Sequence, residues 1–255
     1  MRVTAQASNW SDADKEALKA EVIKARGRFR PWHQSLLEAR PSALKRMSDF
    51  VVASEEGPIG PALRHLIWTA VDAVVTHLYP AGIAIHARVA TQHGVAAEQV
   101  FEALELACLC VTRTFEVGLP IIQSLSGDAS GAATSFSPED EALLRRCASA
   151  MGEIPPWVES GLRLDPVYTR TLIDMVFAPE DATLPPKWRM LICLAIASCP
   201  AIADRTWIER YAAGSLKAGA SIDELVACLK LASGIGIHAL AVGAPAVLEG
   251  LAPAT

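Results

Sequence analysis

The chain has 255 residues, a formal net charge of −5, and a composition, 51% hydrophobic and 20% charged, that is typical of a globular protein. It has no dense basic stripe, so nucleic-acid binding is not expected, and apolar runs such as 191–203 are too short and too interrupted to span a bilayer. The first residues lack the apolar core of a secretory signal, and we therefore predict a soluble cytoplasmic protein that does not enter a membrane.

Helical patterns follow one another along the whole chain. Residues 11–25 begin with capping residues and continue with apolar positions at helical spacing. Ser137-Pro138-Glu139 and "SIDE" (221–224) are further helix starts, with a proline in the first turn and a capping box respectively. No stretch shows the alternation of a strand bounded by hairpin turns, so the predicted fold is all-α. The predicted core helices are 62–77, 81–93 and 96–114, with counterparts at 187–199, 206–218 and 222–238.

The chain repeats itself with an offset of 125 residues. Between 14–123 and 139–248, 28 of the 110 aligned positions are identical, whereas chance gives roughly a tenth of positions in a chain of this composition. The stretch between the copies is rich in Gly, Ser and Ala, as in a linker. The sequence therefore predicts two like halves that pack about a pseudo-twofold axis. They are a first repeat at 11–123, a linker at 124–136 and a second repeat at 137–250.

The cysteines give no sign of a disulfide or a metal site. All six lie in apolar, helix-like stretches, where cysteine usually serves as a small hydrophobic residue. There is no C-x-x-C, and Cys108 and Cys110 point to opposite sides of a helix. The six are Cys108, Cys110, Cys147, Cys193, Cys199 and Cys228.

The order of several segments resembles the carboxymuconolactone decarboxylase family, which is related to the alkyl-hydroperoxidase D-like proteins. The matching features are Arg64 ahead of an apolar helix, "GIAIHARVATQHGV" (82–95), "EQVFEALEL" (98–106) and the closing stretch 218–249. The resemblance implies a tandem duplication of the helical domain of this family. Since single-domain members form rings of six, it also implies a homo-oligomer, a trimer of tandem chains.

The resemblance also narrows the chemistry. The peroxidase-like relatives carry a C-x-x-C dithiol followed four residues later by His, but Tyr79 and Gly82 stand at those places before His86. In those relatives the dithiol reduces the peroxide and is then reduced again, so their chemistry is not expected here. The resemblance is therefore to the decarboxylases, which work without a metal or organic cofactor on small anionic lactone acids. This chain departs from them in one respect, since they often carry Glu where it has Gly82.

The two copies have kept different polar residues. This complementary loss favours one kind of site assembled from both halves, although independent drift of the copies would give the same pattern. The first copy has His77, Tyr79 and His86 where the second has Ile202, Asp204 and Tyr211, and Arg113 occupies the place of His238.

Four residues are predicted to be catalytic. His86 is at the family's histidine position and can exchange a proton near neutral pH, although a lone His on an apolar helix is more often a core residue. His77 and Tyr79 lie in a turn before Pro80, where polar residues are common; His77 could hold the substrate carboxylate or act as the acid, and Tyr79 could stabilise an oxyanion. Glu102 lies on an otherwise apolar helix and is the predicted partner of His86.

The remaining polar residues are given lesser roles. His238 and Arg113 are predicted to bind the anionic, partly apolar substrate. His93 suits a solvated helix end, where the helix dipole favours a cation. His33 and His65 have no evident partner in the sequence.

The sequence is compatible with three functions. The first is a cofactor-free lyase or isomerase, similar to the decarboxylases, that acts on a small cyclic or unsaturated carboxylic acid or lactone by proton transfer through histidine. The second is a binding protein of the same fold, for an apolar ligand or a partner subunit. The third and weakest is a thiol peroxidase that uses Cys108 or Cys110.

Overall fold

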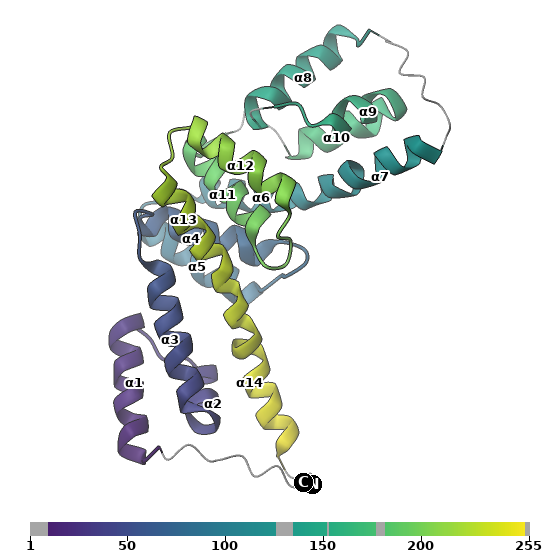
Figure 1. The fold of residues 1–255 in the computed structure, drawn as a ribbon. Coiled ribbons are helices and arrows are strands. Elements are labelled where there is room, and N and C mark those ends of the chain that lie inside the picture. The colour runs from purple at the N-terminus through teal and green to yellow at the C-terminus, as the bar shows by residue number, and fades with distance from the viewer. Residues whose placement is uncertain (1–9, 126–134, 152, 177–181, 253–255) are drawn as a thin grey trace. The chain divides into compact units, whose positions relative to one another are not determined.

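The protein is helical throughout the part described by the computed structural model, which covers residues 10–125, 135–151, 153–176 and 182–252 and contains no strand in those ranges (Figure 1). Eight of the helices begin with proline, whose fixed φ suits the first helical position and whose missing N–H costs no hydrogen bond there. The predicted all-α class is confirmed. Two compact units are formed, Met1–Gly57 with Ser233–Thr255, and Pro58–Ala232.

The first unit joins the first and last helices of the chain. Apolar residues at helical spacing on three helices, among them Leu18, Leu37 and Leu44, form its buried core. Leu240 and Ala244 from the C-terminal helix pack against this core. The helices are α1 (Asp12–Arg26), α2 (Pro31–Ala39), α3 (Pro41–Glu55) and α14 (His238–Leu251), the last preceded by a 3₁₀ turn η3 (Gly234–Ile237).

The second unit has two buried helices at its centre. Every residue of α11 from Met190 to Ala197 is buried, which accounts for its nearly uniform apolar sequence. The Trp68 indole N–H on α4 donates to the Leu231 carbonyl at 3.1 Å, so even the polar atom of this buried ring is satisfied. The central helices of this unit are α4 (Pro61–Ala73), α5 (Pro80–Gln92), α6 (Ala97–Ala107), α11 (Pro186–Ser198), α12 (Arg205–Lys217) and α13 (Ile222–Ser233).

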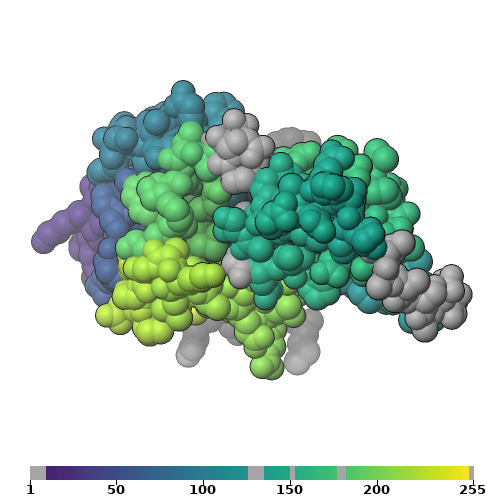
Figure 2. Space-filling model, turned by 90° about the horizontal axis from the view of Figure 1, so that it is seen from above, coloured from purple at the N-terminus to yellow at the C-terminus, as the bar shows by residue number. Residues whose placement is uncertain are grey.

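A second group of helices in the same unit packs through aromatic side chains. The ring of Phe115 stacks on Tyr168 with centroids 5.0 Å apart and meets Trp157 edge-on at 6.3 Å. Figure 2 shows the side chains of this group, in teal to green, as one continuous body. The elements are the 3₁₀ turn η1 (Cys108–Val111), α7 (Thr112–Leu125), α8 (Pro138–Met151), α9 (Pro156–Leu164) and α10 (Pro166–Val176).

Helix boundaries recur with the 125-residue offset of the sequence. Both α4 and α11, and both α5 and α12, begin and end 125 residues apart. The turns between them place Leu78 and Ala203, also 125 residues apart, at positive φ angles of 37° and 44°. A duplicated chain would give helix boundaries of this kind. The duplication itself is our interpretation of the sequence.

The packing units cut across the predicted repeats. In the first unit α14, from the second predicted repeat, packs on α2; in the second unit α7, from the first repeat, packs on α9. The last helix of each predicted repeat therefore packs with the early helices of the other. The predicted third helices also end sooner than expected, because the chain tightens into 3₁₀ turns at Cys108 and Gly234 before a further helix begins.

One helical stretch exceeds the apolar runs noted in the sequence. Ile222–Leu251 is long and apolar enough to cross a membrane by length and composition, with a mean hydropathy of 1.9 in its best window. Of that window, 39% is buried inside the protein, and apolar core helices of soluble proteins meet the same criterion.

Candidate functional site

The candidate site is built on the helical hairpin of α4 and α5. His65 and Asp72 are seven residues apart on α4, and Gly82 and His86 are four apart on α5, so each pair lies on one face of its helix. The turn between the helices is closed by the Tyr79 backbone N–H, which donates to the Asp72 carbonyl at 2.8 Å. The hairpin thereby brings residues of two helices and one turn to a common point.

The centre of this arrangement is the carboxyl group of Asp72, whose side chain is 1% exposed. Its Oδ1 lies 3.6 Å from Nε2 of His77, and its Oδ2 lies 4.0 Å from Nε2 of His86. Burial raises the pKa of the Asp72 carboxyl to about 8 and lowers the pKa of His77. Near pH 7 the proton therefore resides on Asp72, and His77 faces it as a neutral ring instead of as the cation of an ion pair.

Gly82 provides the room for this carboxyl group. A Cβ atom at position 82 would lie 1.9 Å from Oδ2 of Asp72 and 2.6 Å from the Tyr79 ring, both far closer than real atoms approach. Position 82 is thus glycine because the Asp72 carboxyl lies directly against the backbone of α5. The acidic group beside position 82 is therefore supplied by Asp72 of α4 and not by a residue of α5.

Gly82→Ala should destabilise the protein, although glycine-to-alanine changes inside helices usually stabilise by about 1 kcal/mol. The added methyl group must displace Asp72 or separate α4 from α5, and overpacking of this kind costs roughly 1–3 kcal/mol. Urea unfolding would measure the change. The matched control is Gly118→Ala in α7, where a Cβ meets nothing within 4 Å and should be neutral or stabilising. Equal behaviour of the two variants would contradict the close approach of Asp72.

The fold also occurs in a solved structure of another protein. No protein-family model and no curated protein matches the chain. Among solved structures it is similar to one from Burkholderia xenovorans LB400 described as a "putative gamma-carboxymuconolactone decarboxylase subunit", with a TM-score of 0.83 and 26% sequence identity. The match covers 93% of this chain and 97% of the other. This similarity supports the predicted resemblance to the carboxymuconolactone decarboxylase family. The predicted helical fold of this kind is confirmed.

His86 of the candidate site has a second histidine, His65, as its partner. Nδ1 of His65 lies 2.9 Å from Nδ1 of His86, and the His65 ring is 9% exposed. One of the two nitrogens must donate and the other accept. If His65 donates, the proton of neutral His86 is on Nε2, facing Asp72; if His86 donates, its Nε2 faces Asp72 as an acceptor. The His65 contact therefore couples the tautomer of His86 to the proton on Asp72.

The prediction that Glu102 is the partner of His86 is wrong. Its carboxylate accepts hydrogen bonds from the Arg189 guanidinium, from the backbone N–H and hydroxyl of Thr183 (2.6 and 2.8 Å), and from the Leu184 N–H (2.7 Å). Although burial raises the pKa of Glu102, these hydrogen bonds lower it overall. Glu102 is a structural anion that joins α6 to α11 and the segment before it.

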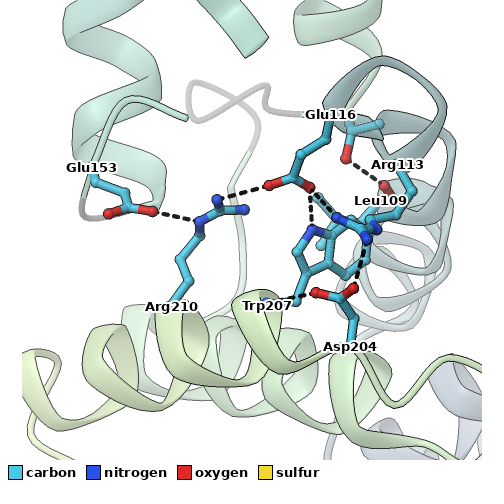
Figure 3. A network of polar contacts seen from close by, with 8 residues as sticks. Leu109, Arg113, Glu116, Glu153, Asp204, Trp207 and Arg210 are labelled. Atoms are coloured by element: carbon cyan, nitrogen blue, oxygen red, sulfur yellow. Dashed lines mark hydrogen bonds and ion pairs between the residues drawn. The ribbon is translucent and has the colours of Figure 1, made fainter. Parts of the chain in front are cut away.

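The prediction that Arg113 binds substrate is also corrected. Its guanidinium donates to Glu116 at 3.0 Å and pairs with Asp204 at 2.6 Å, over the ring of Trp207 (Figure 3). Glu116 also accepts from the Trp207 indole and from Arg210. The charge of Arg113 is thus neutralised by two carboxylates within the protein.

This network lies where the second copy would have its own site. With the 125-residue offset, Asp204, Trp207 and Tyr211 replace Tyr79, Gly82 and His86. The Trp207 and Tyr211 side chains are 1% and 2% exposed, so bulky rings fill the place where Gly82 leaves room. Burial raises the pKa of Tyr211 well above its usual value, so its hydroxyl stays protonated near pH 7 and cannot serve as a base there.

The other predicted site residues have the following places. His77 and His86 both lie beside Asp72, and the Tyr79 ring lies 6.2 Å from that of His77, so the hairpin brings all three to one region. His238 begins α14 in the first unit, and its predicted role stays a prediction. His93 ends α5 and is exposed, as expected, and its ring stacks near that of His65 with centroids 6.4 Å apart.

Sequence reasoning missed two residues of the site. Asp72 is the one acidic residue of α4, and the second copy has Ala197 in its place. His65 precedes it by seven residues on the same helix face, and the second copy has Met190 there. The sequence signal that could have identified them is a carboxylate in an apolar helix. It lies seven residues from a histidine, and the other copy lacks it.

Asp72, His77 and His86 are of the residue types that bind zinc or iron, so chemistry alone would admit a cation at this place. The predicted absence of a cofactor therefore stays a prediction. The cysteines offer little chemistry: burial, Cys110 and Glu105 raise the pKa of the exposed Cys108, which disfavours the reactive thiolate.

Proposed function

We propose that the chain is a cofactor-independent lyase of the decarboxylase type, acting on a small cyclic or unsaturated carboxylic acid or lactone. The observation that carries this proposal is the buried Asp72 carboxyl between the Nε2 atoms of His77 and His86. Its raised pKa of about 8 makes it an acid that keeps its proton at neutral pH and can still give it up. The name of the similar solved structure supports the same class of reaction.

The reaction would proceed by loss of CO₂ and return of a proton. When the bond between the substrate carbon and its carboxylate breaks, the electron pair moves into the conjugated system toward the lactone carbonyl. Asp72 then supplies the proton that forms the new C–H bond, directly or through His86. His77 would neutralise part of the charge of the departing carboxylate, and the Tyr79 hydroxyl would donate to the developing oxyanion.

The test is the conversion of γ-carboxymuconolactone, followed by CO₂ release, in the wild type and in His86→Asn. We expect roughly a 100-fold lower kcat/KM in the variant, because general acid–base catalysis typically contributes at least that much. Turnover should persist in EDTA. His93→Asn, at the exposed end of the same helix, is the matched control and should retain activity.

The alternative function, a binding protein of the same fold, predicts a different result. A calorimetric titration would then show that wild type and His86→Asn both bind the lactone while neither releases CO₂. Equal turnover by both proteins would instead remove His86 from the mechanism. The proposed assembly, a trimer of tandem chains, can be measured by sedimentation of the same samples.

A further inference from the structure

A cluster of arginines lies in the first unit, far along the sequence from the candidate site. Residues 26–30 read "RGRFR", three arginines in five residues of an acidic chain, while the aligned "MGEIP" (151–155) of the second copy has none. The segment turns sharply after α1, because Gly27 adopts the left-handed conformation with φ of 67°. Arg26 thus ends α1, and Arg30 is the residue directly before the first turn of α2.

A buried histidine lies against this segment and cannot accept hydrogen bonds from both of its neighbours. His33 is fully buried; its Nδ1 faces the backbone N–H of Arg30 at 3.0 Å, and its Nε2 faces Nη1 of Arg26 at 3.2 Å. Both neighbours are donors, but a neutral imidazole can accept at only one nitrogen. Burial and then Arg26, Arg30 and Arg28 lower the pKa of His33 to about 3, so the ring adds no charge of its own.

The positive charge of the cluster is only partly compensated nearby, by the carboxylate of Glu55, which acts on Arg26 and Arg28 without an ion pair to either. Among the residues that the structure describes, no carboxylate lies within ion-pair distance of these arginines; the ion pairs of α3 join Lys45 to Glu21 and Asp49 instead. The Nε atoms of Arg26 and Arg28 are buried and make no hydrogen bond to any described residue. Burial, followed by repulsion from Arg28, lowers the pKa of Arg26 to about 10, even though Glu55 acts against it from α3.

We propose that Arg26, Arg28 and Arg30 form a binding site for a small oxyanion, carrying a phosphate or carboxylate group. Guanidinium groups bind such oxygens through paired N–H donors, and all three arginines are partly exposed, so an anion can approach the outer N–H groups of their side chains. An anion would also offset the cost of three like charges held together in a partly buried place. The site is independent of the proposed decarboxylation, since none of its residues belongs to α4 or α5.

The experiment compares thermal unfolding of the full chain in phosphate, in succinate and in chloride at equal ionic strength. For the wild type we expect at least one of the two oxyanions to raise Tm by several degrees at concentrations well above its Kd. The arm with the larger shift distinguishes phosphate from carboxylate. Arg28→Gln should lose most of the shift, whereas Arg205→Gln, an exposed arginine on α12, should keep it.

A second measurement separates binding from a structural role. In chloride, Arg28→Gln should unfold at the same temperature as the wild type or higher, because the change removes a repelling charge. An arginine that only supports the fold would give a lower Tm when replaced. The proposal is overturned if neither oxyanion shifts the wild type, or if Arg28→Gln responds to them as the wild type does.

Discussion

Asp72→Asn should lower kcat/KM by roughly 10²–10⁴-fold and at the same time make the protein more stable at pH 8. Asparagine has the same shape and can still fill the space against Gly82, but it cannot give a proton to substrate or to His86. The activity of the wild type should fall above about pH 8, where Asp72 loses its proton. In the variant, whatever activity remains should lack this decline.

The gain in stability follows from the same raised pKa. The Asp72 carboxyl ionises near 3.8 in the unfolded chain and near 8 in the folded protein. Below pH 3.8 both states hold the proton, so the group has no effect on unfolding. Between these values only the unfolded state releases it, so the free energy of unfolding falls as the pH rises toward 8. The accumulated loss is on the order of 5 kcal/mol, which Asp72→Asn should restore.

Urea unfolding of both proteins at pH 4.5 and pH 8 would measure this difference. The advantage of Asp72→Asn should be small at the lower pH and should grow toward the higher one. Asp223→Asn changes an exposed aspartate at the start of α13 and should show no such trend. A constant difference at both pH values would mean that the Asp72 carboxyl is ionised in the folded protein over this whole range.

The helices and the family could be predicted from local patterns, while the partners of individual side chains could not. Helix starts are encoded by caps and prolines close in sequence, and the family by the order of its segments. The partner of Glu102 is Arg189, 87 residues away, and no local rule relates the two. Likewise Arg113 meets Asp204 only because α7 and α12 lie in one unit.

The site itself was partly accessible from the sequence. His77, Tyr79 and His86 follow one another within a single helical hairpin, so their proximity follows from short-range connectivity. Asp72 could not be recognised from the sequence because its role depends on the absence of a side chain at Gly82. The two residues lie on different helices, and only the packing of α4 on α5 brings them together. The internal copy contains this information, since Ala197 and Trp207 replace Asp72 and Gly82 together.

Glu102→Ala should be the most destabilising of the substitutions considered, by roughly 3–5 kcal/mol in urea unfolding. Removing the carboxylate leaves the Arg189 guanidinium without its partner and leaves the Thr183 and Leu184 N–H groups without their acceptor. A buried donor that has lost its acceptor still bears the cost of its removal from water, and it forms few hydrogen bonds with water to offset that cost. Glu105→Ala, an exposed glutamate three residues later on α6, should change stability by less than about 0.5 kcal/mol.

Replacing both Glu102 and Arg189 shows whether the loss of stability in Glu102→Ala comes from the unpaired Arg189 charge or from the loss of the hydrogen bonds to the backbone. In Glu102→Leu with Arg189→Met no charge remains unpaired, so the double variant should lose less stability than Glu102→Ala alone. It should not recover fully, because Thr183 and Leu184 still lack an acceptor. A double variant as unstable as the single one would mean that Glu102 acts mainly by holding the backbone at Thr183. In either case, the activity of the variants can be compared with the fraction of protein that is folded. If activity falls only as far as the folded fraction does, Glu102 takes no part in the mechanism that we assign to Asp72 and His86.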